Sequence, residues 1–156
     1  MGPGLALCGA LMMMTTTSCG SADDGTLLTP YLAVGEALAK DELPPPPLAA
    51  RIVEQARSKA GEPGTDALAD GAAELDTADL PSARAAFQRM SAGMIESMKA
   101  DPKSQPGHVI VHCPMTFGGK GGLWVQRRGK IANPYEGSRM LRCGDIVDWG
   151  AALPET

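Results

Sequence analysis

The spacing of apolar side chains divides the chain into a helical part, residues 29–105, and a part with a different pattern, residues 106–150. In the first part apolar residues recur at three- and four-residue steps, as on one face of a helix, most clearly from Leu80 to about Ala100. This stripe consists of Phe87, Met90, Met94, Ile95 and Met98. Breaks that contain Pro and Gly separate the shorter helices predicted before it, near residues 30–42, 48–60 and 66–75.

The pattern changes after Gly107 from helical to strand-like. The β-branched run 109–111 predicts a short strand, residues 123–126 predict a second one, and four glycines lie between them. Four helices with short connections are typical of an antiparallel bundle. We therefore expect a mainly α fold, an antiparallel four-helix bundle over residues 29–105. A C-terminal cap of short β-strands and a Gly-rich loop, residues 106–150, is expected to pack on this bundle in one domain.

The first 18 residues have the composition of a signal peptide. They carry no charge, and residues 5–14 form an apolar stretch that is too short to span a bilayer comfortably. Small residues precede Cys19, as in bacterial lipoprotein processing sites, so we expect cleavage there, a lipid on Cys19 and a tether over residues 19–28. Because a basic start is missing and Thr16 stands where Leu is usual, an uncleaved leader and ordinary secretory cleavage stay open as alternatives. The expected location is the periplasm or cell surface, anchored to the membrane by lipid.

Charge and motifs narrow the function classes. The net charge is −4, and the nearest approach to a basic cluster is Arg127, Arg128 and Lys130, which argues against nucleic acid as a partner. The chain has no nucleophile elbow, no phosphate-binding loop and no H-E-x-x-H helix. We therefore expect a binding or structural protein and not an enzyme.

Two sulfur-containing segments flank the Gly-rich loop. One is His112-Cys113-Pro114-Met115 and the other is Met140-Leu141-Arg142-Cys143. Thiolate and thioether are the soft ligands that select Cu(I), and imidazole also suits copper. The pattern predicts a soft-metal site, with Cu(I) first, whose ligands are Cys113, Met115, Met140 and Cys143, with His112 as an additional candidate.

A structural disulfide is the alternative interpretation of the same cysteines. Without Cys8 in the leader and Cys19 under lipid, Cys113 and Cys143 are the remaining thiols of the mature chain. Their bridge would close a loop of about 30 residues and contribute about 3 to 4 kcal/mol. Redox state decides between the two, because a reduced pair can bind metal and an oxidised pair cannot.

The C-terminal third resembles an uncharacterised bacterial periplasmic family with C-P-M-A, G-A-x-W, N-P-Y-x-G and M-L-x-C-G motifs. Thr116 and Leu123 depart from this pattern, where the family has Ala. The family occurs alone in exported proteins and fused to adaptor subunits of heavy-metal efflux systems. The resemblance implies copper or silver handling with an efflux adaptor or pump as partner, and we expect Trp124 and Tyr135 to shield the metal. The matching residues are Cys113, Pro114, Met115, Gly122, Trp124, Asn133, Pro134, Tyr135, Gly137, Met140, Leu141, Cys143 and Gly144.

Overall fold

The computed structural model describes residues 26–75 and 79–156. The predicted signal peptide, the lipidation site Cys19 and most of the tether lie outside the described residues. No described helix is long and apolar enough to cross a membrane.

All four helices predicted from the sequence are present. They are α1 (Leu28–Leu38), α2 (Pro46–Ser58), α3 (Thr65–Glu74) and α4 (Leu80–Ala100). α1 ends earlier than predicted, and Asp41 just beyond it has a left-handed backbone with φ of 62°. α2 begins inside the proline run, because a proline in the first turn of a helix lacks only an N–H that would have no helical acceptor.

A small antiparallel sheet follows the helices in the chain. Its strands are β1 (His108–Cys113), β2 (Gly122–Arg127) and β3 (Asp145–Val147), in the order β2-β1-β3. The short helix α5 (Thr116–Gly119) lies between β1 and β2. The first two strands confirm the predicted ones. β3 was not predicted, because three residues are too few to show an alternating pattern.

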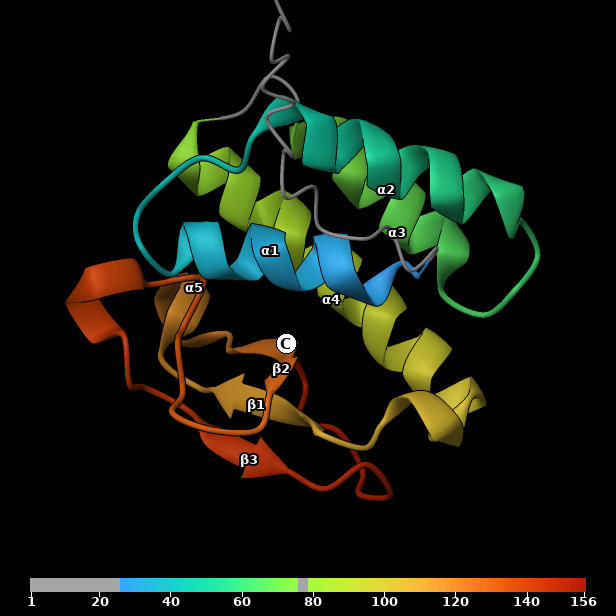
Figure 1. Ribbon diagram of the computed structural model, residues 1–156. Coiled ribbons are helices and arrows are strands. Elements are labelled where there is room, and N and C mark those ends of the chain that lie inside the picture. Colours follow the sequence, from blue (N-terminus) through green and yellow to red (C-terminus); the bar gives the residue numbers. More distant parts are fainter. Residues whose placement is uncertain (1–25, 76–78) are drawn as a thin grey trace, which may run out of the picture.

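The molecule has a helical layer and a sheet layer (Figure 1). α3 packs between α2 and α4, while α4 and α1 also pack against β2. The apolar core therefore extends from the helices into the sheet, and its largest fully buried side chains include Trp124, Tyr31, Phe87, Leu38 and Ile52. The mainly helical class with a strand-containing C-terminal part is confirmed. A four-helix bundle is not confirmed, because α1 and α4 use part of their apolar surface to cover the sheet.

Two tyrosine hydroxyls form hydrogen bonds with backbone groups of β2 on the edge that does not face β1. The backbone N–H of Val125 donates to the hydroxyl of Tyr31 at 3.1 Å, and the hydroxyl of Tyr135 donates to the carbonyl of Leu123 at 2.5 Å. Tyr31 and Tyr135 are both buried, and this burial raises the pKa of each phenol. The two side chains thus close this edge of the sheet against the helical layer.

Candidate functional site

Cys113 and Cys143 form a disulfide that joins the end of β1 to the segment before β3. The two Cα atoms are 5.7 Å apart, and the cysteines are separated by 30 positions in the sequence. Cys113 is completely buried, whereas Cys143 is partly buried. The structure thus contains the disulfide that the sequence left as an alternative to a reduced metal site.

The two methionines of the predicted site lie close to the cysteines in sequence but are not buried with them. The side chain of Met115 is 62% exposed, which is unusual for a large apolar residue. Met140 is partly buried, and its backbone carbonyl accepts a hydrogen bond from the amide of Cys143 at 2.9 Å.

His112 does not join the two sulfurs. Side chains of successive strand residues point to opposite faces of a sheet, so His112 leaves β1 on the side opposite Cys113. Its Nε2 atom is buried beside Gly121 and has no hydrogen-bond partner within the described part of the chain. The structure therefore brings together Cys113 and Cys143, with His112 on the other side of the strand.

The predicted Cu(I) site depends on the sulfur atoms of Cys113 and Cys143. Thiolates are the donors that would dominate a Cu(I) site, and both sulfur atoms are engaged in the disulfide. Over residues 26–75 and 79–156, no group of three or more His, Cys, Asp or Glu side chains could hold a metal ion. The oxidised site does not fit the predicted metal, and a fit requires prior reduction of the disulfide.

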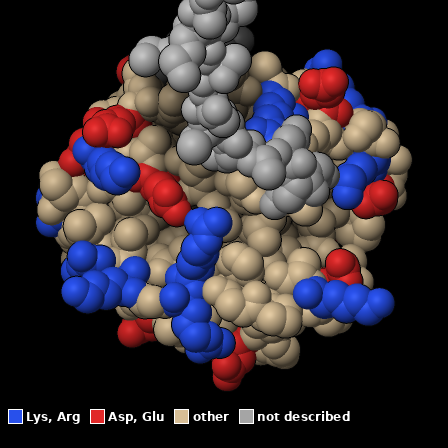
Figure 2. All heavy atoms as spheres, in the orientation of Figure 1, with Lys and Arg blue, Asp and Glu red and all other residues tan. Residues whose placement is uncertain are grey.

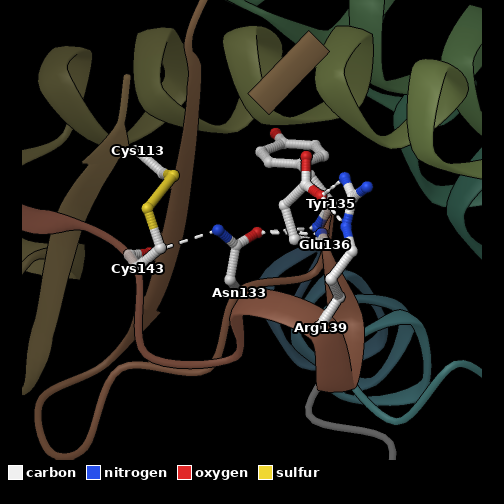
Figure 3. The surroundings of a disulfide bond; sticks show 6 residues. All are labelled: Cys113, Asn133, Tyr135, Glu136, Arg139 and Cys143. Carbon is white, nitrogen blue, oxygen red and sulfur yellow. Dashed lines mark hydrogen bonds and ion pairs between the residues drawn. A yellow bond between two sulfur atoms is a disulfide. The ribbon is translucent and has the colours of Figure 1, made fainter. Parts of the chain in front are cut away.

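Asn133 links Cys143 of the disulfide to the N-P-Y-E-G turn, residues 133–137 (Figure 3). Its side-chain amide donates to the carbonyl oxygen of Cys143 at 3.1 Å. Its side-chain oxygen accepts from the backbone amides of Tyr135 at 2.9 Å and Glu136 at 3.2 Å. Asn133 is completely buried, so these bonds replace water for each of its polar atoms.

The two aromatic residues expected to shield a metal belong to a buried cluster. The ring of Tyr135 lies edge-on to Trp124, with centroids 5.7 Å apart, and 5.9 Å from Phe87 of α4. Trp124 of β2 lies opposite Val111 of β1 in the register of the sheet, and Val111 precedes Cys113 by two residues. Their observed contacts connect the sheet to the helical layer.

An ion pair between the partly buried Arg84 and the exposed Asp41 links the same turn to the helices, and sequence reasoning missed it. Arg84 of α4 donates to Asp41 at 2.6 Å and to the carbonyl of Pro134 at 3.0 Å. Hydrogen bonds from the side chain and backbone of Ser138, followed by those from Arg84, lower the pKa of Asp41 from 3.8 to about 2. Asp41 and Arg84 are ordinary polar positions at the end of one predicted helix and on the face of another.

Gly137 gives the signal that could have found this ion pair. Its φ is 55°, and a Cβ atom at this position would lie 1.9 Å from Oδ1 of Asp41. The glycine of the N-P-Y-E-G segment therefore allows the backbone to approach the carboxylate, and a glycine at a fixed place in a motif indicates such an approach.

The basic residues after β2 do not form an isolated positive surface. Arg127 pairs with Glu36 of α1 at 3.1 Å, and both side chains are well exposed. Figure 2 shows basic and acidic side chains interspersed over the face in view. On that face there is no large field of one sign.

Comparisons of the chain with protein-family models, with curated proteins and with solved structures find no match. The resemblance to the periplasmic family therefore stays a prediction that rests on the motifs themselves.

Proposed function

We propose that this protein is an exported, lipid-anchored interaction domain in which the Cys113–Cys143 disulfide is structural and no metal is held in the oxidised state. The observation that carries this proposal is the complete burial of Cys113 in the disulfide. Buried cysteines in apolar surroundings are chemically inert, unlike the exposed cysteines of redox or metal-transfer sites. Disulfides persist outside the cytoplasm, which supports export through the predicted leader.

The contacts around the disulfide support a structural role. Asn133 ties Cys143 to the N-P-Y-E-G turn, and Arg84 ties the same turn to α4 through the carbonyl of Pro134. The disulfide is thus one of several links that hold residues 131–147 on the rest of the domain. In a small domain such links restrict an irregular segment that has little regular secondary structure of its own.

Binding of Cu(I) after reduction is the second candidate function, and one observation favours it. Met115 exposes 62% of its surface although it follows the buried Cys113 by only two residues. An exposed thioether beside a thiol pair could complete a soft-metal site with Cys113, Cys143 and Met140 once a reductant has opened the bridge. The resemblance to a family fused to efflux adaptors agrees with this candidate, with such an adaptor or pump as the partner.

Thiol counting joined to a Cu(I) titration tests the two candidates. Free thiols are counted in protein isolated from the producing cells without reductant. Cu(I) affinity is then measured under reducing conditions by competition with a chromophoric chelator. The variants are Cys113→Ser and the double variant Met115→Leu, Met140→Leu, which leaves side-chain volume nearly unchanged. Met90→Leu, in the buried core of α4, is the matched control.

Each outcome supports one candidate. A structural disulfide predicts no free thiols and no tight Cu(I) binding by the reduced protein. A copper site predicts tight binding that Cys113→Ser abolishes and that the Met double variant weakens about tenfold, equivalent to about 1.4 kcal/mol, while Met90→Leu leaves it unchanged. Free thiols in the isolated protein would contradict the structural interpretation directly.

A further inference from the structure

A cleft of about 410 Å³ lies where the N-P-Y-E-G turn meets the start of α4 and the short helix α5. Its volume lies within the range usual for small-molecule sites, about 300 to 1,000 Å³. The cleft is distinct from the disulfide and has both charged and aromatic walls. Its lining includes Asp41, Arg84, Phe117, Tyr135, Glu136 and Arg139.

The aromatic wall is formed at a conformational cost. Phe117 lies 5.1 Å from Tyr135 between ring centroids and has φ of 51°. A bulky residue rarely adopts this left-handed conformation, which is strained and persists where the surroundings impose it. Among the described residues, the non-glycine residues with positive φ are Phe117 and Asp41, and both border this cleft.

In the charged wall, a positively charged group and a negatively charged group each keep an atom that is available for a hydrogen bond to a ligand. Arg84 uses its Nε and Nη2 atoms on protein acceptors, and its Nη1 atom makes no hydrogen bond within the described part of the chain. The side chain of Glu136 is 7% exposed, and both hydrogen bonds from Arg139 end on its Oε2 atom. Donors on a guanidinium and the second oxygen of a carboxylate therefore remain for a ligand.

The balance of charge selects the kind of ligand. Two guanidiniums, Arg84 and Arg139, face two carboxylates, Asp41 and Glu136, so the cleft has no net charge. A simple anion would be attracted by the two guanidiniums and repelled by the two carboxylates, and a simple cation would experience the reverse. A ligand with one charge of each sign can be complementary to both.

We propose that this cleft binds a small zwitterion, a free α-amino acid with an aromatic or branched apolar side chain. Its carboxylate would accept from the guanidinium of Arg84, its ammonium would donate to Oε1 of Glu136, and its side chain would pack on Phe117 and Tyr135. This site goes beyond the proposed function, and no cysteine lines it.

Titration of the mature, disulfide-bonded chain by backbone amide NMR tests the site with three probes. L-phenylalanine carries both charges, 3-phenylpropionate lacks the ammonium, and phenethylamine lacks the carboxylate. We expect saturable shifts at residues 117 and 135–139 with L-phenylalanine, and at least tenfold weaker binding of each singly charged probe.

Variants of the charged wall make the test specific. Glu136→Gln should weaken L-phenylalanine about tenfold, while binding of 3-phenylpropionate stays the same or improves. Arg139→Gln provides a second variant that should fold, because its side chain is 76% exposed, and it should also weaken L-phenylalanine. Glu74→Gln removes the exposed pair with Arg89 elsewhere on the helices and serves as the matched control that leaves binding unchanged.

Two results would overturn the proposal. One is the absence of saturable shifts in the cleft with L-phenylalanine and with L-leucine at concentrations well above those used for the singly charged probes. The other is equal binding of all three probes, or binding that Glu136→Gln and Arg139→Gln leave unchanged in folded protein.

Discussion

The side-chain amide of Asn133 donates a hydrogen bond to the backbone carbonyl of Cys143 at 3.1 Å. The backbone amide of Asn133 also donates to the carbonyl of Leu141 at 2.9 Å. The N-P-Y-E-G segment and the M-L-R-C-G segment are therefore joined directly through two residues, Asn133 and Cys143, that are ten positions apart. Two motifs that look separate in the sequence form a single structural unit.

Asn133→Ala should destabilise the domain by about 2 to 4 kcal/mol, because it leaves the partly buried carbonyl of Cys143 and two buried amides without their partners. The measurement is the free energy of unfolding in urea. Asn133→Asp keeps the acceptor for the amides of Tyr135 and Glu136 but loses the donor to Cys143, so its stability should fall between those of the parent and Asn133→Ala. A loss below about 0.5 kcal/mol, the size of an ordinary surface substitution, would show that these bonds add nothing.

Reduction of the disulfide should cost about 3 to 4 kcal/mol, the loop-closure value for a separation of 30 residues. Urea unfolding with and without reductant measures this difference. The Cys113→Ala, Cys143→Ala double variant should have the stability of the reduced parent and should not respond to reductant. Equal stability of the oxidised and reduced parent would contradict a structural role.

Helix periodicity and proline breaks located the helices well, because each buries a repeating apolar stripe. The arrangement of the layers could not be obtained in this way. A stripe such as Phe87 to Met98 shows that α4 is covered but does not say whether a helix or a strand covers it. Here β2 shares that role with α3.

The candidate site was predictable only in its cysteines. A pair of thiols on either side of a loop is visible in one dimension, and so was the choice between a disulfide and a metal. The Asn133–Cys143 bond joins positions 10 residues apart, and no local pattern marks it. The Asp41–Arg84 pair joins positions 43 residues apart, and its one sequence signal, Gly137, does not identify either partner. The placement of His112 depends on strand alternation, which separates it from Cys113 although they are neighbours in sequence.

Asp41→Asn should lower the thermal midpoint at neutral pH, because the charged carboxylate accepts bonds from Ser138 and Arg84. The pKa of Asp41 is lowered in the folded state, so its stabilising effect is present above about pH 3.8. This effect is lost as the pH falls toward 2. Parent and variant midpoints should therefore converge over this interval. Asp70→Asn, on the exposed face of α3, is the control, and a constant difference across this pH range would contradict the assignment.

Cys19→Ala should release the protein from the membrane fraction if Cys19 carries the lipid. Fractionation of the producing cells with an antibody to the domain measures the distribution. Cys8→Ala, within the same leader, is the matched control and should leave the anchored form unchanged. Persistent membrane association of the Cys19 variant would contradict the lipid anchor.

Removal of the tyrosine hydroxyls tests how the edge of β2 is closed. Tyr135→Phe should cost about 1 to 2 kcal/mol, because it removes the donor to the carbonyl of Leu123 and little volume. Tyr31→Phe should cost more, about 2 to 3 kcal/mol, because it leaves the buried amide of Val125 without its acceptor and Ser91 without its partner at 2.8 Å.

Alkaline titration adds an independent measure of the same two side chains. Burial raises the pKa of both phenols, so the folded state keeps protons that the unfolded state releases above about pH 10. Stability should fall as the pH rises beyond that value, and phenolate absorbance should appear together with the loss of helical circular dichroism. The Tyr31→Phe, Tyr135→Phe double variant has no other tyrosines, so this absorbance should vanish from it. Phenolate absorbance of the parent well before unfolding would show that the hydroxyls are open to solvent and that the edge of β2 is not closed in this way.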